Sequence, residues 1–310
     1  MAIHVGEGPV EEVIARSVVP KPLWRRIVDF PLVTMLIAVA IFILALSAGF
    51  LIAKLLPPMD KTAGEIARGA INIGLVWAVY KLVIRHLGEH PRDDLRLAEA
   101  PKGLGVGLAF GLLLFSLVVG IAAIADVYNI IGEGGTGELV SALIAMAILP
   151  GFMEELLFRG ILFRWLEEFG GSWVGLIGSS ALFGLAHITN PGATWSASLL
   201  IAVEAGVLLG GAYMLTRSLW MPIGLHAAWN FTQGEIFDVP VSGLDSHGLV
   251  EAQLSGPPLL SGGTFGLEGS VIALVIATSA GIALVMLAVR QGELVRPWWV
   301  MRRLVRTRRF

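Results

Sequence analysis

The chain contains no cysteine and little charge. Only 15% of its 310 residues are Asp, Glu, Lys or Arg, whereas about a quarter of an ordinary soluble domain is charged. Without cysteine, the chain has no disulfide bond, cysteine-ligated zinc, iron–sulfur cluster or cysteine nucleophile. The formal net charge of −2 gives no reason to expect a nucleic acid or another strongly charged partner.

Hydrophobic residues are abundant instead and occur in long runs. They make up 55% of the chain, and the mean hydropathy is +0.78. A transmembrane helix needs about 17–25 mostly apolar residues, and we find eight candidate spans by this measure. They lie at 32–54, 67–85, 104–126, 139–165, 173–189, 197–216, 219–236 and 270–289. The sequence therefore predicts an all-α, polytopic integral membrane protein with its helices in one bundle.

Positive charge alternates between the loops. Basic residues precede the first span, separate the second from the third, join the sixth to the seventh and follow the last. Residues 127–138, 188–196 and 237–269 contain no Lys or Arg. Because cytoplasmic loops carry the excess of Lys and Arg, we expect both termini on the cytoplasmic side of a cell membrane.

The spans divide the chain into three parts. We expect a cytoplasmic segment at 1–30, a transmembrane domain at 31–290 and a basic cytoplasmic tail at 291–310. The leader before the first span is long for a signal peptide, so that span is interpreted as an uncleaved helix. In the tail, Trp298 and Trp299 favour a position at the lipid headgroups.

The fourth span, ILPGFMEELLFRGILFRW at 148–165, places charge inside an apolar run. An acid or base at the centre of a span costs about 2.5–3.5 kcal/mol. Glu155 and Arg159 are four residues apart and can pair on one helix face, while Glu154 points elsewhere without a local partner. The Pro-Gly pair at 150–151 predicts a break, after which a restarted helix would hold both acids near its N-terminus. A structural ion pair alone would leave Glu154 without a role.

Two later spans contain histidines. In ALFGLAHITN, His187 lies one turn after Phe183, and Asn190 follows one turn later. In SLWMPIGLHAAWN, His226 and Asn230 share one helix face and can donate hydrogen bonds to one point. A lone histidine on an apolar helix is more often a packing residue than a catalyst, so each motif alone is a weak signal.

Together, the three spans offer a carboxylate, two imidazoles and an amide. Glu154 and a histidine can share a water and remove its proton, and His226 with Asn230 can stabilise the resulting oxyanion. This set suits water attack on a carbonyl without a covalent nucleophile. Glu154, His187 and His226 equally fit a catalytic zinc site, since two histidines, a glutamate and an open water position form a known set.

Other features carry weaker signals. Two GxxxG pairs predict close helix packing rather than binding. These pairs are Gly107 with Gly111 and Gly206 with Gly210. Glu204 in the sixth span is interpreted as a packing or outer-interface residue, with a place in the cavity as the alternative. The loop 237–269 contains no recognisable motif.

The three polar motifs resemble those of the CPBP family of intramembrane proteases. This family includes the type II CAAX prenyl endopeptidases and relatives involved in bacteriocin immunity. EELLFR is similar to its EExxxR motif, FGLAH to its FxxxH motif and HAAWN to its HxxxN motif, in the same order across residues 154–230. The resemblance implies a helical membrane fold with its motif core at 139–236. It also implies hydrolysis of a peptide bond in a membrane-associated protein or peptide, within the bilayer.

The resemblance also implies individual roles. Glu154 would be the activating carboxylate with His187 beside it, His226 and Asn230 would form the oxyanion site, and Glu155 and Arg159 would support them. The family is often called metalloprotease, and a metal-free glutamate mechanism has also been proposed for it. Zinc held by Glu154, His187 and His226 therefore stays open.

Two other functions use the same residues. A catalytically silent membrane scaffold or immunity-type protein could bind a partner through the polar cluster, although the intact motifs argue against it. A transporter or a haem-binding subunit could also use intramembrane histidines and acids. The chain shows no inverted repeat, which disfavours the transporter.

Overall fold

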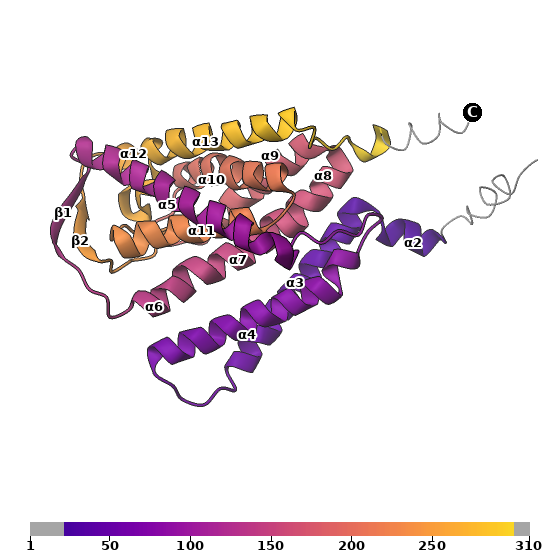
Figure 1. The fold of residues 1–310 in the computed structure, drawn as a ribbon, viewed down its shortest axis with the longest axis horizontal. Helices are drawn as coiled ribbons and strands as arrows, with labels where there is room; N and C mark the ends of the chain where they lie inside the picture. The colour runs from indigo at the N-terminus through magenta and orange to yellow at the C-terminus, as the bar shows by residue number, and fades with distance from the viewer. Residues whose placement is uncertain (1–21, 301–310) are drawn as a thin grey trace, which may run out of the picture.

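The computed structural model describes residues 22–300, and helices dominate it (Figure 1). The long helices are α3 (Pro31–Ala53), α4 (Lys61–Leu82), α5 (Ala100–Ile124), α9 (Ser172–Ala186), α10 (Trp195–Thr216), α11 (Trp220–Phe231) and α13 (Val271–Arg290). Shorter elements are α2 (Leu23–Val28), α12 (Pro258–Ser261) and the strands β1 (Tyr128–Glu133) and β2 (Val250–Leu254). Most of the expected N-terminal segment and half of the basic tail lie outside the described residues.

Within residues 22–300, seven helical stretches are long and apolar enough to cross a membrane. This confirms a polytopic integral membrane protein, and the expected span positions agree with the helices to within a few residues. The expected span 219–236 is the exception. It forms the 12-residue α11 and a 5-residue π-helix at Thr232–Ile236, and both are almost wholly buried inside the bundle. Neighbouring helices, rather than lipid, surround α11.

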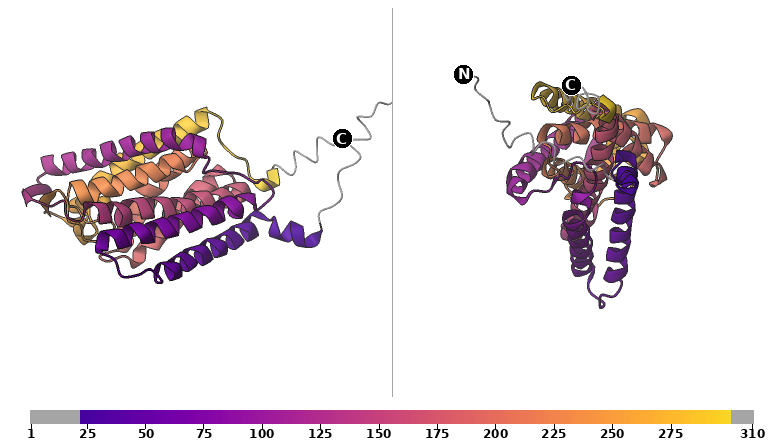
Figure 2. Two further views of the ribbon diagram at one scale, coloured as in Figure 1. Left: turned by 60° about the horizontal axis from the view of Figure 1, so that its bottom comes forward. Right: turned by 90° about the vertical axis from the view of Figure 1, so that its right-hand side faces the viewer.

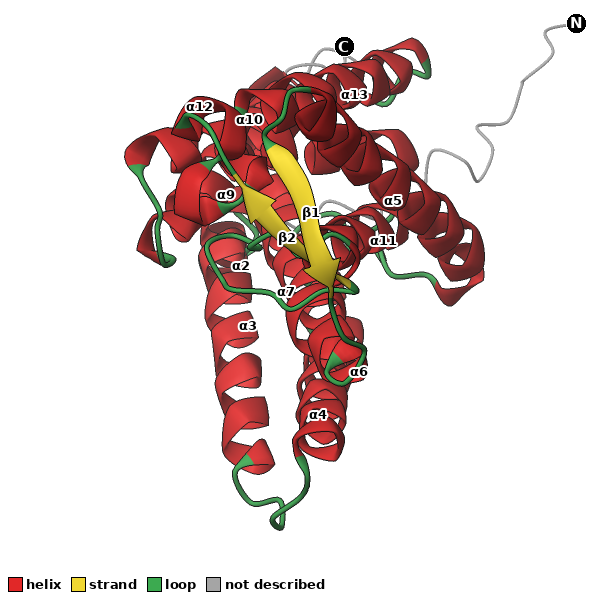
Figure 3. Cartoon of the chain, turned by 90° about the vertical axis from the view of Figure 1, so that its left-hand side faces the viewer, coloured by secondary structure: helices red, strands yellow, loops and turns green. Residues whose placement is uncertain are grey.

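The helices form a bundle with one diverging hairpin. Figure 2 shows most of the long helices running side by side, while α3 and α4 diverge from the others toward their connecting turn (Figures 1 and 3). The loops without Lys or Arg, 127–138, 188–196 and 237–269, gather at one end of the bundle. The basic loops before α5, between α10 and α11 and after α13 lie together at the other end. The turn between α3 and α4 is an exception, because Lys61 pairs with Glu138 at the first end. Which end faces the cytoplasm stays a prediction.

The fourth span is a continuous helical stretch and does not break at Pro150. It contains α6 (Leu139–Ala142), a π-helix at Leu143–Ile148, α7 (Leu149–Glu155), a π-helix at Leu156–Phe163 and α8 (Arg164–Gly170). Proline has no N–H and its ring clashes with the carbonyl four residues earlier in an α-helix. The wider π-helical turn before Pro150 accommodates both effects. The expected break was wrong, and Glu154 lies inside the stretch instead of at a free helix end.

Small residues bring the helix backbones together, as the GxxxG pairs predict. A Cβ atom on Gly107 of α5 would lie 2.2 Å from the Met221 carbonyl oxygen of α11. A Cβ atom on Gly206 of α10 would lie 2.4 Å from the Ser180 Cβ of α9. Only glycine fits such contacts, so α5 positions α11 and α9 positions α10 at backbone distance.

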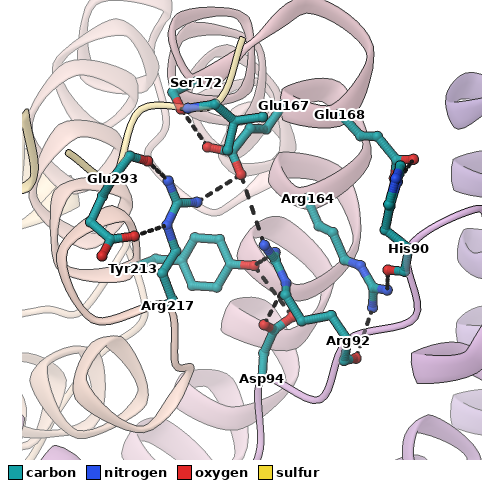
Figure 4. A network of polar contacts seen from close by, with 11 residues as sticks. His90, Arg92, Asp94, Arg164, Glu167, Glu168, Ser172, Tyr213, Arg217 and Glu293 are labelled. Carbon is teal, nitrogen blue, oxygen red and sulfur yellow. Dashed lines mark hydrogen bonds and ion pairs between the residues drawn. The ribbon is translucent and has the colours of Figure 1, made fainter. Parts of the chain in front are cut away.

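A partly buried polar network connects the elements at the basic end of the bundle (Figure 4). Arg92, in the loop after α4, donates to the Tyr213 hydroxyl and forms an ion pair with Asp94, with 2.8 Å between Nε and Oδ1. Arg217, at the end of α10, donates from Nη1 to Glu167 Oε2 of α8 over 2.7 Å. Part of the basic charge therefore holds helix ends together instead of facing solvent.

The loop 237–269 closes the opposite end of the bundle. Its β2 pairs antiparallel with β1, which carries a bulge (Figure 3). The Asp238 carboxylate accepts the backbone N–H groups of Gly248 and Ala252, each over 3.0 Å. This two-stranded ribbon is a small addition to the expected all-α fold. The end of the loop enters the bundle, where Glu268 lines a cavity.

Candidate active site

Glu154, His187 and His226 meet at one point between α7, the end of α9 and α11. Glu154 Oε2 lies 3.9 Å from His187 Nε2 and 4.0 Å from His226 Nε2. These distances are too long for direct hydrogen bonds, but one water can contact the carboxylate and an imidazole together. Glu154 Oε2 is buried and has no hydrogen-bond partner. The three motifs therefore converge as the sequence predicts.

The hydrogen bond at His187 fixes its tautomer. Its Nδ1 lies 2.8 Å from the carbonyl oxygen of Phe183, one turn earlier. A carbonyl only accepts hydrogen bonds, so Nδ1 carries the proton and Nε2 presents a lone pair toward Glu154 when the ring is neutral. The ring also lies against the Phe183 ring, with 4.6 Å between centroids. The spacing FxxxH thus supplies both the backbone acceptor and the packing surface.

Glu155 and Arg159 hold His226. Glu155 Oε1 accepts from His226 Nδ1 and from Arg159 Nη1, each over 2.8 Å. The side chains of Glu155 and Arg159 are fully buried. Arg159 also donates from Nη2 to the Ala205 carbonyl of α10 over 3.1 Å. The negative charge of Glu155 and the positive charge of Arg159 offset each other in the buried pair. The Glu155 carboxylate also orients the His226 ring so that its Nε2 faces Glu154.

Asn230 is positioned by the region around Pro150. Its Nδ2 donates to the Met146 carbonyl over 3.0 Å. Met146 lies four residues before Pro150, and an α-helical residue with an N–H at 150 would have bonded this carbonyl. The proline and the π-helix therefore present an acceptor to α11. One N–H of the Asn230 amide remains for another partner.

A small cavity of about 30 Å³ adjoins these groups. His187, His226 and Asn230 line it, together with Glu204 of α10 and Glu268. Such a volume has room for one or two waters. Glu204 is 1% exposed and lines this cavity, which agrees with the alternative that the sequence left open and not with an outer-interface position.

The sequence reasoning missed Glu268. This residue belongs to the short 3₁₀ turn Leu267–Gly269 at the end of the motif-free loop, and it accepts the backbone N–H of Ser242. Burial raises the pKa of its carboxyl group from 4.5 to about 7. No local pattern pointed to it, whereas Glu204 was visible as an acid within a span.

A larger hollow lies between α4, α5, α7 and α11. Its volume is about 700 Å³ and its lining is almost entirely apolar, with Trp77, Leu108, Phe152 and Ala228 among its residues. His226 and Asn230 line the small cavity instead, so α11 contributes residues to both spaces. The hollow offers hydrocarbon groups a place inside the bundle.

The donor arrangement does not match a zinc site. Tetrahedral ligands about 2.1 Å from zinc lie about 3.4 Å from one another, whereas the two measured distances from Glu154 Oε2 are 3.9 and 4.0 Å. Among residues 22–300, no group of three or more His, Cys, Asp or Glu is arranged to hold a metal ion. Glu154, His187 and His226 therefore do not have the spacing of a tetrahedral zinc site in this structure. Zinc stays a prediction, and we derive no step through a metal.

The fold and the site define a polytopic membrane protein with a polar, water-sized site inside its helix bundle. Residues 136–232 match the family model described as type II CAAX prenyl endopeptidase Rce1-like. Over these residues the chain is therefore similar to the Rce1-like domain, in agreement with the resemblance that the three motifs carry.

The chain is also similar to a curated membrane protein. The chain is 26% identical over 179 residues to "Putative membrane peptidase YdiL" of Bacillus subtilis (strain 168). The alignment covers 53% of this chain and 70% of the relative. No solved structure matches the chain.

Proposed function

We propose that the protein is an intramembrane endopeptidase that hydrolyses a peptide bond of a membrane-associated protein or peptide by direct attack of water. The observation that carries the proposal is the unpartnered Glu154 Oε2, which faces two imidazole nitrogens at 3.9 and 4.0 Å. The Rce1-like domain and the similarity to a peptidase support the reaction class.

Glu154 and His187 activate the water. A water in the gap donates one hydrogen bond to the Glu154 carboxylate and the other to the lone pair of His187 Nε2. Its oxygen forms a bond to the scissile carbonyl carbon while Glu154 takes the proton. Glu154 then passes this proton to the leaving amine nitrogen as the carbon–nitrogen bond breaks. No protein atom becomes covalently attached to the substrate.

His226 and Asn230 stabilise the oxyanion of the tetrahedral intermediate. The free N–H of the Asn230 amide is one donor. His226 donates from Nε2 when its ring is protonated on both nitrogens, because Nδ1 already donates to Glu155. The Glu155 carboxylate, which accepts from His226 Nδ1 and from Arg159 Nη1, favours this imidazolium form.

The apolar hollow suits the apolar part of a membrane-associated substrate. Its volume of about 700 Å³ and apolar lining would accept a hydrocarbon chain or an apolar side chain. Prenylated peptides therefore belong among the test substrates.

The test measures cleavage of quenched-fluorescent peptides, including prenylated ones, by the purified protein in lipid nanodiscs. Glu154→Ala and His187→Ala should each lose about 100-fold or more in kcat/KM, the usual contribution of a general base. Glu133→Ala, on the exposed strand β1, is the matched control and should keep full activity. Thermal unfolding establishes that every variant is folded.

Addition of a chelator distinguishes the metal-free mechanism from a zinc-dependent one. Turnover that survives chelator supports the glutamate–histidine mechanism, whereas loss that zinc restores would refute its metal-free form. Normal cleavage by Glu154→Ala would overturn the proposal. No cleavage of any substrate by the unmodified protein would favour the silent scaffold.

A further inference from the structure

Glu204 and Glu268 line the cavity but take no part in the reaction described above. Glu204 comes from the middle of α10 and Glu268 from the end of the loop after α11, and they are 1% and 5% exposed. Glu204 Oε2 is buried without any hydrogen-bond partner. Buried carboxylates normally have partners, so this one requires an explanation.

No basic side chain of the cavity neutralises these acids. The residues that line it include two Glu and two His but no Lys or Arg. His226 already donates to Glu155, and His187 donates to a backbone carbonyl. The nearby Arg159 is committed to Glu155 and to the Ala205 carbonyl. The cavity therefore has more acidic groups than basic partners for them.

The cavity also limits what can enter. Its volume of about 30 Å³ suits a group about as large as one or two waters. An ammonium group is compact and has three donors, whereas a guanidinium is a broad planar fork. Ile201, Leu208 and Leu225 form the apolar part of the lining, where the methylene chain of a lysine can pack.

We propose that Glu204 and Glu268 form a subsite for a primary ammonium group and select substrates with a lysine next to the scissile bond. The inference rests on the proposed peptidase function, because the subsite shares His187, His226 and Asn230 with the reaction centre. The ammonium hydrogen-bonds to Glu204 Oε2 and to Glu268. The subsite prefers lysine to arginine, because the planar guanidinium is too broad for it, and to norleucine, which has no charge.

The first experiment measures binding without catalysis. n-Butylamine carries the ammonium and four-carbon chain of lysine, with 1-butanol and n-butylguanidine as neutral and planar controls at equal ionic strength. Of the three compounds, we expect n-butylamine but neither control to raise the Tm of the full-length protein, and the rise should saturate with concentration. Glu154→Ala should show the same rise and Glu204→Gln none. No rise in the unmodified protein, or an equal rise in Glu204→Gln, would overturn the proposal.

The second experiment measures selectivity with matched peptides carrying lysine, arginine or norleucine on either side of the scissile bond. In the unmodified protein, kcat/KM for lysine should exceed that for norleucine by about 10- to 100-fold, the range of a hydrogen bond to a charged group. The difference should lie mainly in KM, because the subsite binds a group that does not react. Glu204→Gln and Glu268→Gln should abolish the preference, while Glu133→Gln should keep it.

The two experiments separate the inference from the proposed function. Cleavage without a lysine preference would mean a hydrolase in which the two acids only share a proton, which refutes the subsite. Amine binding without cleavage of any peptide would uphold the ammonium site and reject the peptidase function.

Discussion

Gly107 offers the sharpest test of how the fold positions the site. It lies on α5 where the backbone of α11 passes closest, and α11 carries His226 and Asn230. A Cβ atom at this position would lie 2.2 Å from the Met221 carbonyl oxygen and 2.7 Å from the Leu225 nitrogen. Both are backbone atoms, so no side-chain rotation can relieve the contact. Gly107→Ala must therefore push the two helices apart.

The size of the effect follows from these distances. Ordinary Cβ contacts begin near 3.4 Å, so the helices must separate by about 1 Å. Overpacking of this kind costs about 1–3 kcal/mol, from which the better helix propensity of alanine recovers up to about 1 kcal/mol. A displacement of about 1 Å at a reacting group can reduce the rate by about 100-fold. We therefore expect a larger loss of activity than of stability.

Gly105→Ala is the matched control on the same helix. Gly105 is exposed, and no atom lies within 4 Å of a Cβ atom built there. This variant should be as stable as the unmodified protein or slightly more stable. Thermal unfolding in one detergent and kcat/KM on one peptide compare the two variants. Equal stability and equal activity of Gly107→Ala and Gly105→Ala would refute the close approach of α5 and α11.

Two further predictions concern buried charge. Arg159→Met leaves the Glu155 carboxylate buried without its cation and should destabilise the protein by about 3–5 kcal/mol. Glu155→Gln in the same chain should recover part of that loss in denaturant unfolding, and no recovery would contradict the pairing. Because burial raises the pKa of Glu268 from 4.5 to about 7, its contribution to stability is present below pH 4.5 and is lost as the pH rises through 7. Glu268→Gln lacks this loss, so it should gain up to about 3 kcal/mol relative to the unmodified protein between pH 5 and 8. Tm profiles against pH that run parallel for Glu268→Gln and the unmodified protein would refute this pH dependence.

The transmembrane fold was predictable because its main signal is local. A helix satisfies its own backbone hydrogen bonds, so a run of apolar residues of sufficient length is enough to specify a span. α3 and α13 were found in this way to within a few residues. α11 shows the limit of the method, because it is as apolar as a span but is short and buried among other helices.

The break expected at Pro150 shows where local rules fail. Proline disfavours the α-helical turn before it. The residues before Pro150 form a π-helix, so the helical stretch continues through the proline and no new helix starts there. The carbonyl of Met146 finds its partner 84 positions later in the chain, where Asn230 of α11 donates a hydrogen bond to it. No inspection of residues 143–155 alone reveals that partner.

The sequence by itself determined which groups are available, since the side chains of Glu154, His187, His226 and Asn230 occur in three spaced motifs within apolar helices. It also determined that such groups in a membrane require partners, because an unpaired charge in hydrocarbon is costly. Only the tertiary structure decided the pairing. It assigned Glu155 to His226 and Arg159, left Glu154 facing both imidazoles, and brought Glu268 from a distant loop beside Glu204. The physical reason is that helix periodicity fixes only which face of its own helix a side chain occupies. Its partner depends on how backbones pack across the bundle, and that packing is set by contacts such as Gly107 on α11.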